Sequence, residues 1–369
     1  MRDYYMEKAL CFREEDLKQY VARFFEHFLV PSADAAIAAD VIIQADLRGI
    51  ASHGISKLYQ YYGNRLEAGR INPRSELKIL KETRNTVSFD GGNGIGHVLA
   101  SRAMEACIQK AKEYSVGIGT VCNSNHFGIA GYYAMMAVEH NLIGGCFTNS
   151  EVLVAPTFGK ARVLGTNPIS LAVPALNRPS FVLDMATSIK PLGQVLLHEV
   201  QGKAIPLGWG MDSRGDPTTV PGDVRNDGAL LPLGGSEQMS GYKGYGLALL
   251  VEILSGVLSG SGLGTAVGSP LSTGGPPANV GHFFIAIDIE SFRPFSDFVK
   301  DLEALLEQIV LSAKVAGESR IYVHGEKEYE QTLEYRRAGI PILAPVVEEL
   351  RTRGRTINVP FDIEPVHVL

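Results

Sequence analysis

The sequence lacks the features that mark membrane proteins and nucleic-acid-binding proteins. It contains no run near the roughly 18 uninterrupted apolar residues that a membrane-spanning helix needs. Its first residues, Met1-Arg2-Asp3-Tyr4-Tyr5, have no apolar core of the kind found in signal peptides. The formal net charge is −6 and no run of like charge occurs, which disfavours binding to phosphate backbones. We therefore expect a cytoplasmic protein that binds neither a membrane nor nucleic acid.

The sequence is also poor in cysteine and in motifs that bind metals. Its four cysteines form no C-x-x-C pair, and no histidine lies in an H-E-x-x-H motif. Cys107 falls on the apolar side of a helical pattern, where free thiols are commonly buried. We therefore predict no metal site, and we expect free thiols in a reducing compartment at Cys11, Cys107, Cys122 and Cys146.

The glycine fingerprint of the common dinucleotide-binding fold is missing. The nearest stretches, residues 92–96 (GNGIG) and 260–264 (GSGLG), both fail the G-x-G-x-x-G spacing. The chain has 369 residues, of which 45% are hydrophobic, so it can bury a large core. This length favours two interleaved domains.

Hydrophobic periodicity predicts an α/β chain. Helical spacing dominates residues 12–70, where Ser32 is expected to cap a helix. Strands and helices then alternate over residues 77–147, at a spacing that predicts parallel pairing. Further strands are predicted at 169–173, 181–183 and 282–289, loops at 206–240 and 259–280, and helices at 98–114, 129–140, 244–258, 295–313 and 328–352.

Residues 45–54, with the sequence ADLRGIASHG, are the most informative stretch. Gly49 ends one helical pattern, and a second begins after Gly54. Ser52 and His53 are therefore expected at a junction between two helices, where the first amides of the next helix are unpaired. Such a junction favours a carboxylate or a developing oxyanion, so we interpret His53 as a catalytic candidate.

Three other residues lie at positions typical of ligand contact. His126 follows a strand that ends at Cys122, and Asp184 follows the strand at 181–183. Lys243 lies between glycines at the start of a helix, where it can meet a phosphate. The alternatives to ligand contact are a helix-capping role for His126 and for Asp184, and a solvent-exposed loop position for Lys243. The remaining candidates are interpreted as structural or surface histidines: His27, His140, His198, His282, His324 and His367.

Together these segments resemble the malate/L-lactate dehydrogenase family of the second type, which includes ureidoglycolate, sulfolactate and 2,3-diketogulonate oxidoreductases. The resemblance implies an α/β, non-Rossmann nicotinamide-binding fold with a mixed sheet, NAD or NADP as cofactor, and a homodimer. It also implies a helical part from residues 1–75 and 315–369 beside a central α/β part at 76–314. The motifs cover about residues 30–290: ADLRGIASHG, LEAGRINP, NSNHFGIAGYY, LGTNPISLAVP, LDMATS, GYKGYGLALLVEILSGVLSG and NVGHFFIAIDI.

The resemblance further implies roles for individual residues. His53 and His126 would donate or accept the proton, and the substrate would lie near Ser52, Tyr61 and Ser150. Arg48 and Lys57 are candidates to hold its carboxylate, although Arg48 can equally form a structural ion pair. The cofactor would contact Asp184, Met185, Ala186, Lys243, Gly325, Glu326 and Lys327.

Two positions depart from the family pattern. Lys57 stands where relatives generally carry arginine, so a planar two-pronged grip on a carboxylate becomes a point charge. Gly193-Gln194 stands where relatives often have Gly-Lys, which removes one positive charge. These departures concern substrate preference and the cofactor region.

The expected reaction is hydride transfer between NAD(P) and a small 2-hydroxy acid of the malate, lactate or ureidoglycolate type. We favour His53 for the proton transfer, with His126 as the alternative base or oxyanion partner, because imidazole titrates near neutral pH. Reduction of a cyclic imine or a diketo sugar acid would need the same residues. A metal-dependent lyase using His53, His126 and Asp184 as ligands, and a binding protein without turnover, are the alternatives from other classes.

Overall fold

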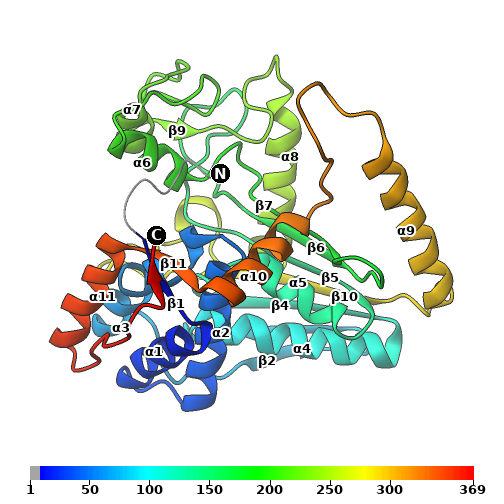
Figure 1. Cartoon of the computed structure of the whole chain (residues 1–369), viewed down its shortest axis with the longest axis horizontal. Helices are drawn as coiled ribbons and strands as arrows, with labels where there is room; N and C mark the ends of the chain where they lie inside the picture. The colour runs from blue at the N-terminus through cyan, green and yellow to red at the C-terminus, as the bar shows by residue number, and fades with distance from the viewer. Residues whose placement is uncertain (1–8) are drawn as a thin grey trace.

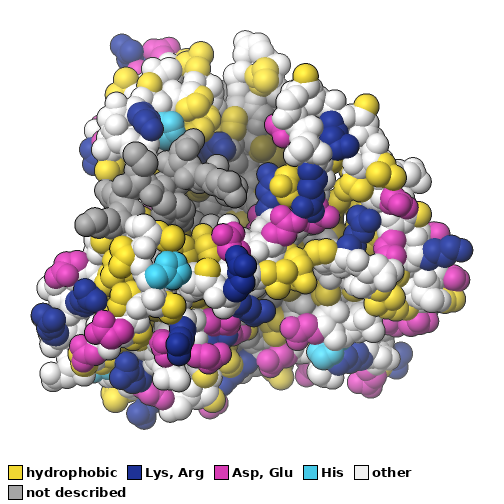
Figure 2. All heavy atoms as spheres, viewed as in Figure 1, with side chains coloured by type: hydrophobic (Ala, Val, Ile, Leu, Met, Phe, Trp, Pro, Cys, Tyr) yellow, Lys and Arg dark blue, Asp and Glu magenta, His cyan; other side chains and the backbone are white. Residues whose placement is uncertain are grey.

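The computed structural model describes residues 9–369, and the expectation about residues 1–5 lies outside that part (Figure 1). Between residues 9 and 369, no helix is long and apolar enough to cross a bilayer. Figure 2 shows positive and negative side chains intermingled over the face in view.

A seven-stranded mixed sheet forms the centre of the molecule, which confirms the predicted α/β class. Its strand order is β2-β3-β4-β10-β5-β6-β7, in which β3 and β4 pair in parallel and the other neighbours pair antiparallel. The strands are β2 (Lys78–Glu82), β3 (Thr86–Asp90), β4 (Val116–Ser124), β5 (Leu142–Thr148), β6 (Ile169–Val173), β7 (Phe181–Met185) and β10 (Val280–Asp288).

The predicted parallel pairing holds for only one of the two strand-helix-strand units. β3 and β4 pair in parallel, as expected, but β10 lies between β4 and β5 and pairs antiparallel with both. The prediction that β4 and β5 pair directly is therefore wrong. The prediction fails because β10, which is buried on both faces and comes much later in the chain, lies between these two strands.

Two helices cover one face of this sheet, and one covers the other. α4 (Gly96–Tyr114) and α5 (Ala130–Val138) pack on the first face, whereas the π-helical turn η5 (Glu252–Val257), which continues α8 (Gly241–Val251), packs on the second. A Cβ at Gly117 would overlap the Cys107 carbonyl, and one at Gly144 would overlap the Ala134 carbonyl. Glycine at these strand positions therefore lets α4 and α5 approach closely.

The helical part joins both ends of the described chain. Aromatic side chains from residues 12–62 and 340–361 share one core, in which Phe12 and Tyr20 both pack edge-on against Phe361. A three-stranded sheet, β11-β1-β12, supports this core. The division into domains at residues 75 and 315 stays a prediction. The elements are β1 (Ala9–Phe12), α1 (Glu14–His27), α2 (Ser32–Leu47), α3 (Asn64–Glu67), α10 (Glu326–Ala338), β11 (Ile340–Leu343), α11 (Ala344–Thr356) and β12 (His367–Val368).

Two local predictions in this part are wrong. α2 begins at Ser32 itself, with Pro31 as the N-cap residue, so Ser32 is not the cap. The single helix expected over 328–352 is two helices, because Gly339 has a φ of +94° and the chain then forms β11 against β1.

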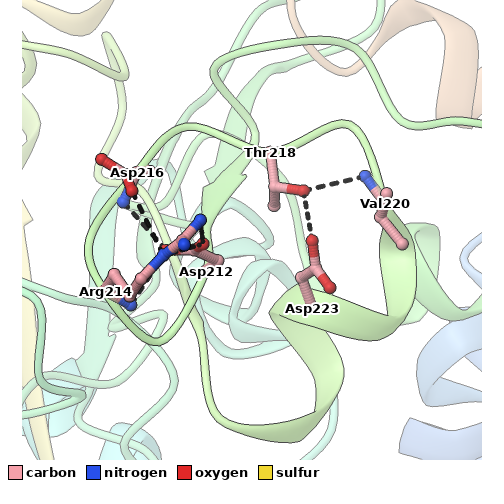
Figure 3. Close-up of polar contacts among 6 residues, drawn as sticks. All are labelled: Asp212, Arg214, Asp216, Thr218, Val220 and Asp223. Carbon is pink, nitrogen blue, oxygen red and sulfur yellow. Dashed lines mark hydrogen bonds and ion pairs between the residues drawn. The ribbon is translucent and has the colours of Figure 1, made fainter.

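A separate lobe, at the top of Figure 1, contains α6 (Leu192–Val200), β8 (Gly210–Met211), α7 (Pro221–Asn226) and β9 (Ala229–Leu230). Helix α6 had no counterpart among the predictions. The prediction of a continuous loop at 206–240 is wrong, because β8, α7 and β9 lie within it. Its connecting segments are ordered by their own polar side chains, as Figure 3 shows for residues 212–223. Asp212 accepts the backbone N–H groups of Arg214 and Asp216, and the Thr218 hydroxyl donates to Asp223 at 2.6 Å. The remaining elements outside the site are η6 (Gly264–Ala266) and α9 (Phe295–Leu311).

Candidate functional site

The rings of His53 and His126 are stacked against each other. Their centroids are 5.5 Å apart and their planes differ by 22°. His53 ends the 3-10 turn η2 (Ala51–His53), and His126 follows the carboxyl end of β4. The structure thus brings together two histidines from the helical part and from the central sheet.

The segment that carries His53 differs from the expected junction of two α-helices. η2 is followed by a second 3-10 turn, η3 (Ile55–Lys57), and by the π-helical turn η4 (Leu58–Gly63). The N–H of Ile55 already donates to Asp46 Oδ2 at 2.7 Å. An amide of this junction thus meets a carboxylate, as predicted, but the carboxylate belongs to the chain itself, so the Ile55 amide is not available to a ligand.

His126 is held from one side by two hydrogen-bonding groups. Tyr62 Oη lies 2.8 Å from Nδ1 of His126, and the N–H of Gly128 donates to the same nitrogen at 3.3 Å. The Tyr61 ring packs edge-on at 5.0 Å. Burial, and then the neighbouring His53, hold the pKa of His126 well below its usual value, so its ring is neutral near pH 7.

His53 also has a lowered pKa. Burial, with a smaller contribution from the Lys57 cation, lowers the pKa of His53 from 6.5 to about 4. Ser52 Oγ lies 2.9 Å from its Nδ1. Because a hydroxyl can donate or accept, this contact leaves both neutral tautomers of His53 available.

The two predicted carboxylate-binding cations have different surroundings. Lys57 lies over the Tyr61 ring at 5.6 Å, and burial lowers its pKa. Arg48, at the C-cap of α2, lies near the carboxylates of Glu328 and Asp184, which partly offset the effect of burial on its pKa. Neither carboxylate forms an ion pair with Arg48 within 4.0 Å among residues 9–369, so the role of Arg48 stays a prediction.

Ser150 lies next to Glu151, whose charge adds to the effect of burial in raising the pKa of Tyr61. The Ser150 hydroxyl accepts the N–H of Thr166 at 3.0 Å. The N–H of Thr187 in turn donates to the Thr166 carbonyl at 2.8 Å. These bonds connect the Tyr61 side of the site to the segment at 184–187.

Asp184, Met185 and Ala186 end and follow β7. Oδ2 of Asp184 accepts the N–H of Gly131, in the first turn of α5, at 2.7 Å. Surrounding protein atoms raise the pKa of Asp184. The carboxylate therefore caps α5, a helix that comes earlier in the chain than Asp184.

Gly325, Glu326 and Lys327 begin α10 beside β7. The N–H of Val182 donates to the His324 carbonyl at 3.0 Å, which places Gly325 against Val182. Glu326 is buried and is engaged by Arg320 and by the N–H of Val323, each at 3.0 Å. Lys327 is exposed, with Nζ 4.6 Å from the centre of the Tyr322 ring. Glu326 is thus committed to contacts within the chain.

Lys243 is exposed in the first turn of α8. Gly244 packs against Leu233, whose N–H donates to the Thr187 carbonyl at 2.8 Å. A Cβ at Gly246 would meet open space. The start of α8 therefore lies near the end of β7, with an accessible cation.

Four residues at or near the histidines were not identified from the sequence. Asp46 lies in the stretch ADLRGIASHG and Tyr62 in the helical pattern of residues 12–70, and neither was singled out as a site residue. His97 is fully buried, packs 4.8 Å from the Tyr62 ring, and has no hydrogen-bond partner for either ring nitrogen within residues 9–369. Arg65 is 2% exposed and its charge helps to lower the pKa of His126.

All four cysteines lie in the described part of the chain. Within residues 9–369, no group of three or more His, Cys, Asp or Glu side chains is placed to hold a metal ion. All four cysteines are free thiols, as predicted. His282 is a buried structural histidine, because its two nitrogens lie 2.8 Å from Thr148 Oγ1 and from Ser124 Oγ.

Comparison with known proteins agrees with this arrangement. Residues 12–351 match the family model described as malate/L-lactate dehydrogenase. The chain is 43% identical over 360 residues to the malate dehydrogenase of Pyrococcus horikoshii, covering 97% of this chain and 98% of that protein. The solved structure of that malate dehydrogenase superposes with a TM-score of 0.88, at 39% identity, covering 97% of each chain.

Two further relatives have other names. The L-sulfolactate dehydrogenase of Methanocaldococcus jannaschii is 38% identical over 344 residues, covering 93% of this chain and 96% of that protein. The ureidoglycolate dehydrogenase (NAD(+)) of Escherichia coli K12 is 30% identical over 306 residues, covering 83% and 84%. The resemblance drawn from the motifs is confirmed, and the chain belongs to the malate/L-lactate dehydrogenase family.

Proposed function

We propose that this protein transfers a hydride reversibly between NAD or NADP and a small 2-hydroxy acid, with His53 and His126 at the reacting carbon. The observation that carries the proposal is the stacked pair of neutral imidazoles, in which His53 lies near the Lys57 cation and His126 follows the carboxyl end of β4. Membership of a dehydrogenase family supports the same reaction. The names of the relatives favour a substrate with a second acidic group, such as malate or sulfolactate.

The two histidines have different chemistry available to them. The N–H of Gly128 can only donate, so Nδ1 of His126 is an acceptor and the proton of the neutral ring lies on Nε2. His126 can therefore donate a hydrogen bond to the substrate oxygen and polarise a carbonyl. His53 is not restricted in this way, so we assign to it the removal of the hydroxyl proton on oxidation and its return on reduction.

The residues at the end of β7 and at the start of α8 are suited to a dinucleotide. Lys243 supplies an exposed cation at the N-terminus of α8, where a positive charge suits phosphate, although the amides of Gly241 and Lys243 already donate to the carbonyls of Ser236 and Ser240. The backbone next to this site belongs to Met185, Ala186 and Gly325. The hydrogen bond from Gly131 to Asp184 holds the end of β7 in place. When bound, the nicotinamide would accept or supply the hydride.

Lys57 is the residue that we expect to hold the substrate carboxylate. Its charge lies beside Tyr61, whereas Arg48 lies near the carboxylates of Glu328 and Asp184. Holding the carboxylate would align the reacting carbon and lower the entropic barrier. We expect Ser52 and Ser150 to complete the polar lining of the substrate site.

We also propose a cytoplasmic homodimer. Free thiols at all four cysteines fit a reducing compartment. Exposed apolar side chains follow one another along α8 and η5, and a second copy of the chain would remove them from water. They are Leu249, Leu250, Ile253, Val257 and Leu258.

The function is tested with the substitutions His53→Asn and His126→Asn. We expect each to lower kcat for malate or sulfolactate oxidation by at least about 100-fold, as for removal of a general acid or base. Cofactor affinity, measured separately by quenching of protein fluorescence, should stay within about twofold of the parent. Turnover that survives both substitutions would sink the proposed mechanism.

A panel of substrates separates the remaining alternatives. NAD(P)H consumption with 2-oxo acids, cyclic imines and diketo sugar acids would rank the three substrate classes. The activity of a metal-dependent lyase would be lost on treatment with chelators. A binding protein without catalytic activity would bind the nicotinamide cofactor but would not turn over any substrate. Family membership and the residue placement support neither of these two.

A further inference from the structure

The loop that carries His53 is held by a carboxylate from the helix before it. Asp46 lies in the last turn of α2 and is 3% exposed. Its Oδ2 accepts the N–H of Ile55 at 2.7 Å. Ile55 comes two residues after His53 and two before Lys57. The bond therefore ties α2 to the loop midway between the two site residues.

The backbone of Gly54 lies directly against the same carboxylate. A Cβ on Gly54 would overlap both oxygens of Asp46. The φ of Gly54 is −90°, a value that other residues adopt freely. Glycine is therefore required here by the close approach of Asp46, and not by the backbone conformation.

A buried carboxyl group at this position lowers the stability of the fold unless its hydrogen bond compensates for the loss of hydration. Burial disfavours its charged form and raises the pKa of Asp46 to about 7, while the bond to Ile55 offsets only part of that effect. An apolar side chain would serve packing equally well. What the carboxylate supplies, and an apolar group cannot, is the acceptor for Ile55.

We propose that Asp46 is a positioning residue that holds residues 51–57, so that His53 stays stacked on His126 and Lys57 stays beside Tyr61. The inference rests on the proposed function for its effect on turnover. Loss of the bond leaves the loop free to shift, and a displacement of about 1 Å at a reacting group can lower the rate roughly 100-fold.

Two substitutions at Asp46 test the hydrogen bond. Asp46→Ala removes the acceptor, whereas Asp46→Asn keeps an oxygen that can accept the N–H of Ile55. We expect Asp46→Ala to lower kcat about 100-fold and to raise the KM for the acid, with unchanged cofactor affinity. Asp46→Asn should retain turnover within about fivefold. The matched control is Asp34→Ala, because Asp34 is a similarly buried carboxylate at the other end of α2, paired with Arg102, and should leave kcat unchanged.

A double-mutant cycle with Gly54 tests the close packing of Asp46 against the loop, without any substrate. Gly54→Ala should lower the thermal midpoint strongly in the parent, because the new methyl overlaps Asp46. In the Asp46→Ala background the same change should cost much less, since the carboxylate is gone. Non-additivity of this kind supports the proposal even if no 2-hydroxy acid is turned over, which would count against the proposed function alone.

Three results would overturn the inference. The first is equal loss of turnover in Asp46→Asn and Asp46→Ala, which would exclude the bond to Ile55 as the cause. The second is a strictly additive cycle. The third is a loss of cofactor affinity in parallel with kcat, which would show that Asp46 maintains the whole fold and not this loop.

Discussion

The hydroxyl of Tyr62 is hydrogen-bonded to Nδ1 of His126 at 2.8 Å, although Tyr59, in the same helical turn, directs its hydroxyl to Tyr20 at 3.1 Å. Both tyrosines are buried. The two hydroxyls thus have similar environments but different partners, which makes them a matched pair for testing how His126 is oriented.

We expect Tyr62→Phe to lower kcat about tenfold, which is the equivalent of one hydrogen bond of about 1.4 kcal/mol. Cofactor affinity should not change, because the phenyl ring keeps the packing. Tyr59→Phe should lower thermal stability slightly and leave kcat unaltered. Steady-state kinetics of both variants decide the matter, and equal effects would argue against a role for the Tyr62 hydroxyl at His126.

The rate of oxidation should persist to unusually low pH. Proton removal needs neutral imidazole, and the pKa of His53 is lowered to about 4, so the base stays competent well below 6.5. We expect the acid limb of kcat/KM for the hydroxy acid to fall near or below pH 5. Lys57→Gln should move this limb to higher pH, because the Lys57 cation helps to lower the pKa of His53. Lys57→Arg keeps the charge and is the control; an unmoved limb in Lys57→Gln would contradict the coupling.

Substitutions of Arg48 and of Lys57 should have different effects. Arg48→Met removes the cation near Asp184 and Glu328, so we expect lower thermal stability with an unchanged KM for the acid. Lys57→Met should raise that KM about 10- to 100-fold, in line with loss of a charged hydrogen bond of roughly 1.5–3 kcal/mol. Initial rates and thermal midpoints of both variants distinguish the roles, and exchange of the two phenotypes would make Arg48 the carboxylate ligand.

Asp46 should make the protein less stable as the pH rises. Its folded pKa of about 7 lies above the unfolded value of about 3.9, so the folded state binds more protons between these values and loses stability as the proton leaves. Between pH 5 and pH 8 this loss amounts to about 2–3 kcal/mol. Asp46→Asn removes it, so the variant should gain stability relative to the parent over this range in denaturant unfolding. A pH-independent difference would exclude a raised pKa.

Features set by local pattern were predictable from the sequence. The apolar period of α4 and the unbroken apolar run of β10 each gave an element close to its observed bounds. His126 was expected at the carboxyl end of a strand, where β4 does place it. In these cases the residues near in sequence decide the structure.

Features that depend on distant residues were not predictable. The pairing of β10 between β4 and β5 and the break that forms β11 both need partners far along the chain. The bond from Asp46 to Ile55 was missed because a helical pattern does not indicate where a buried carboxylate points. Gly54, which was interpreted only as the residue before the next helical pattern, is in fact required by this contact.

The place of β10 in the sheet has a consequence for biosynthesis. While the nascent chain leaves the ribosome, β4 and β5 are complete long before residues 280–288 emerge, and their facing edges have no permanent neighbour in that interval. Closure of such a distant contact is slow, and half-made sheets of this kind adhere to one another. Chains truncated before residue 280 should therefore aggregate, and recovery of refolded full-length protein should depend on how quickly β10 is captured.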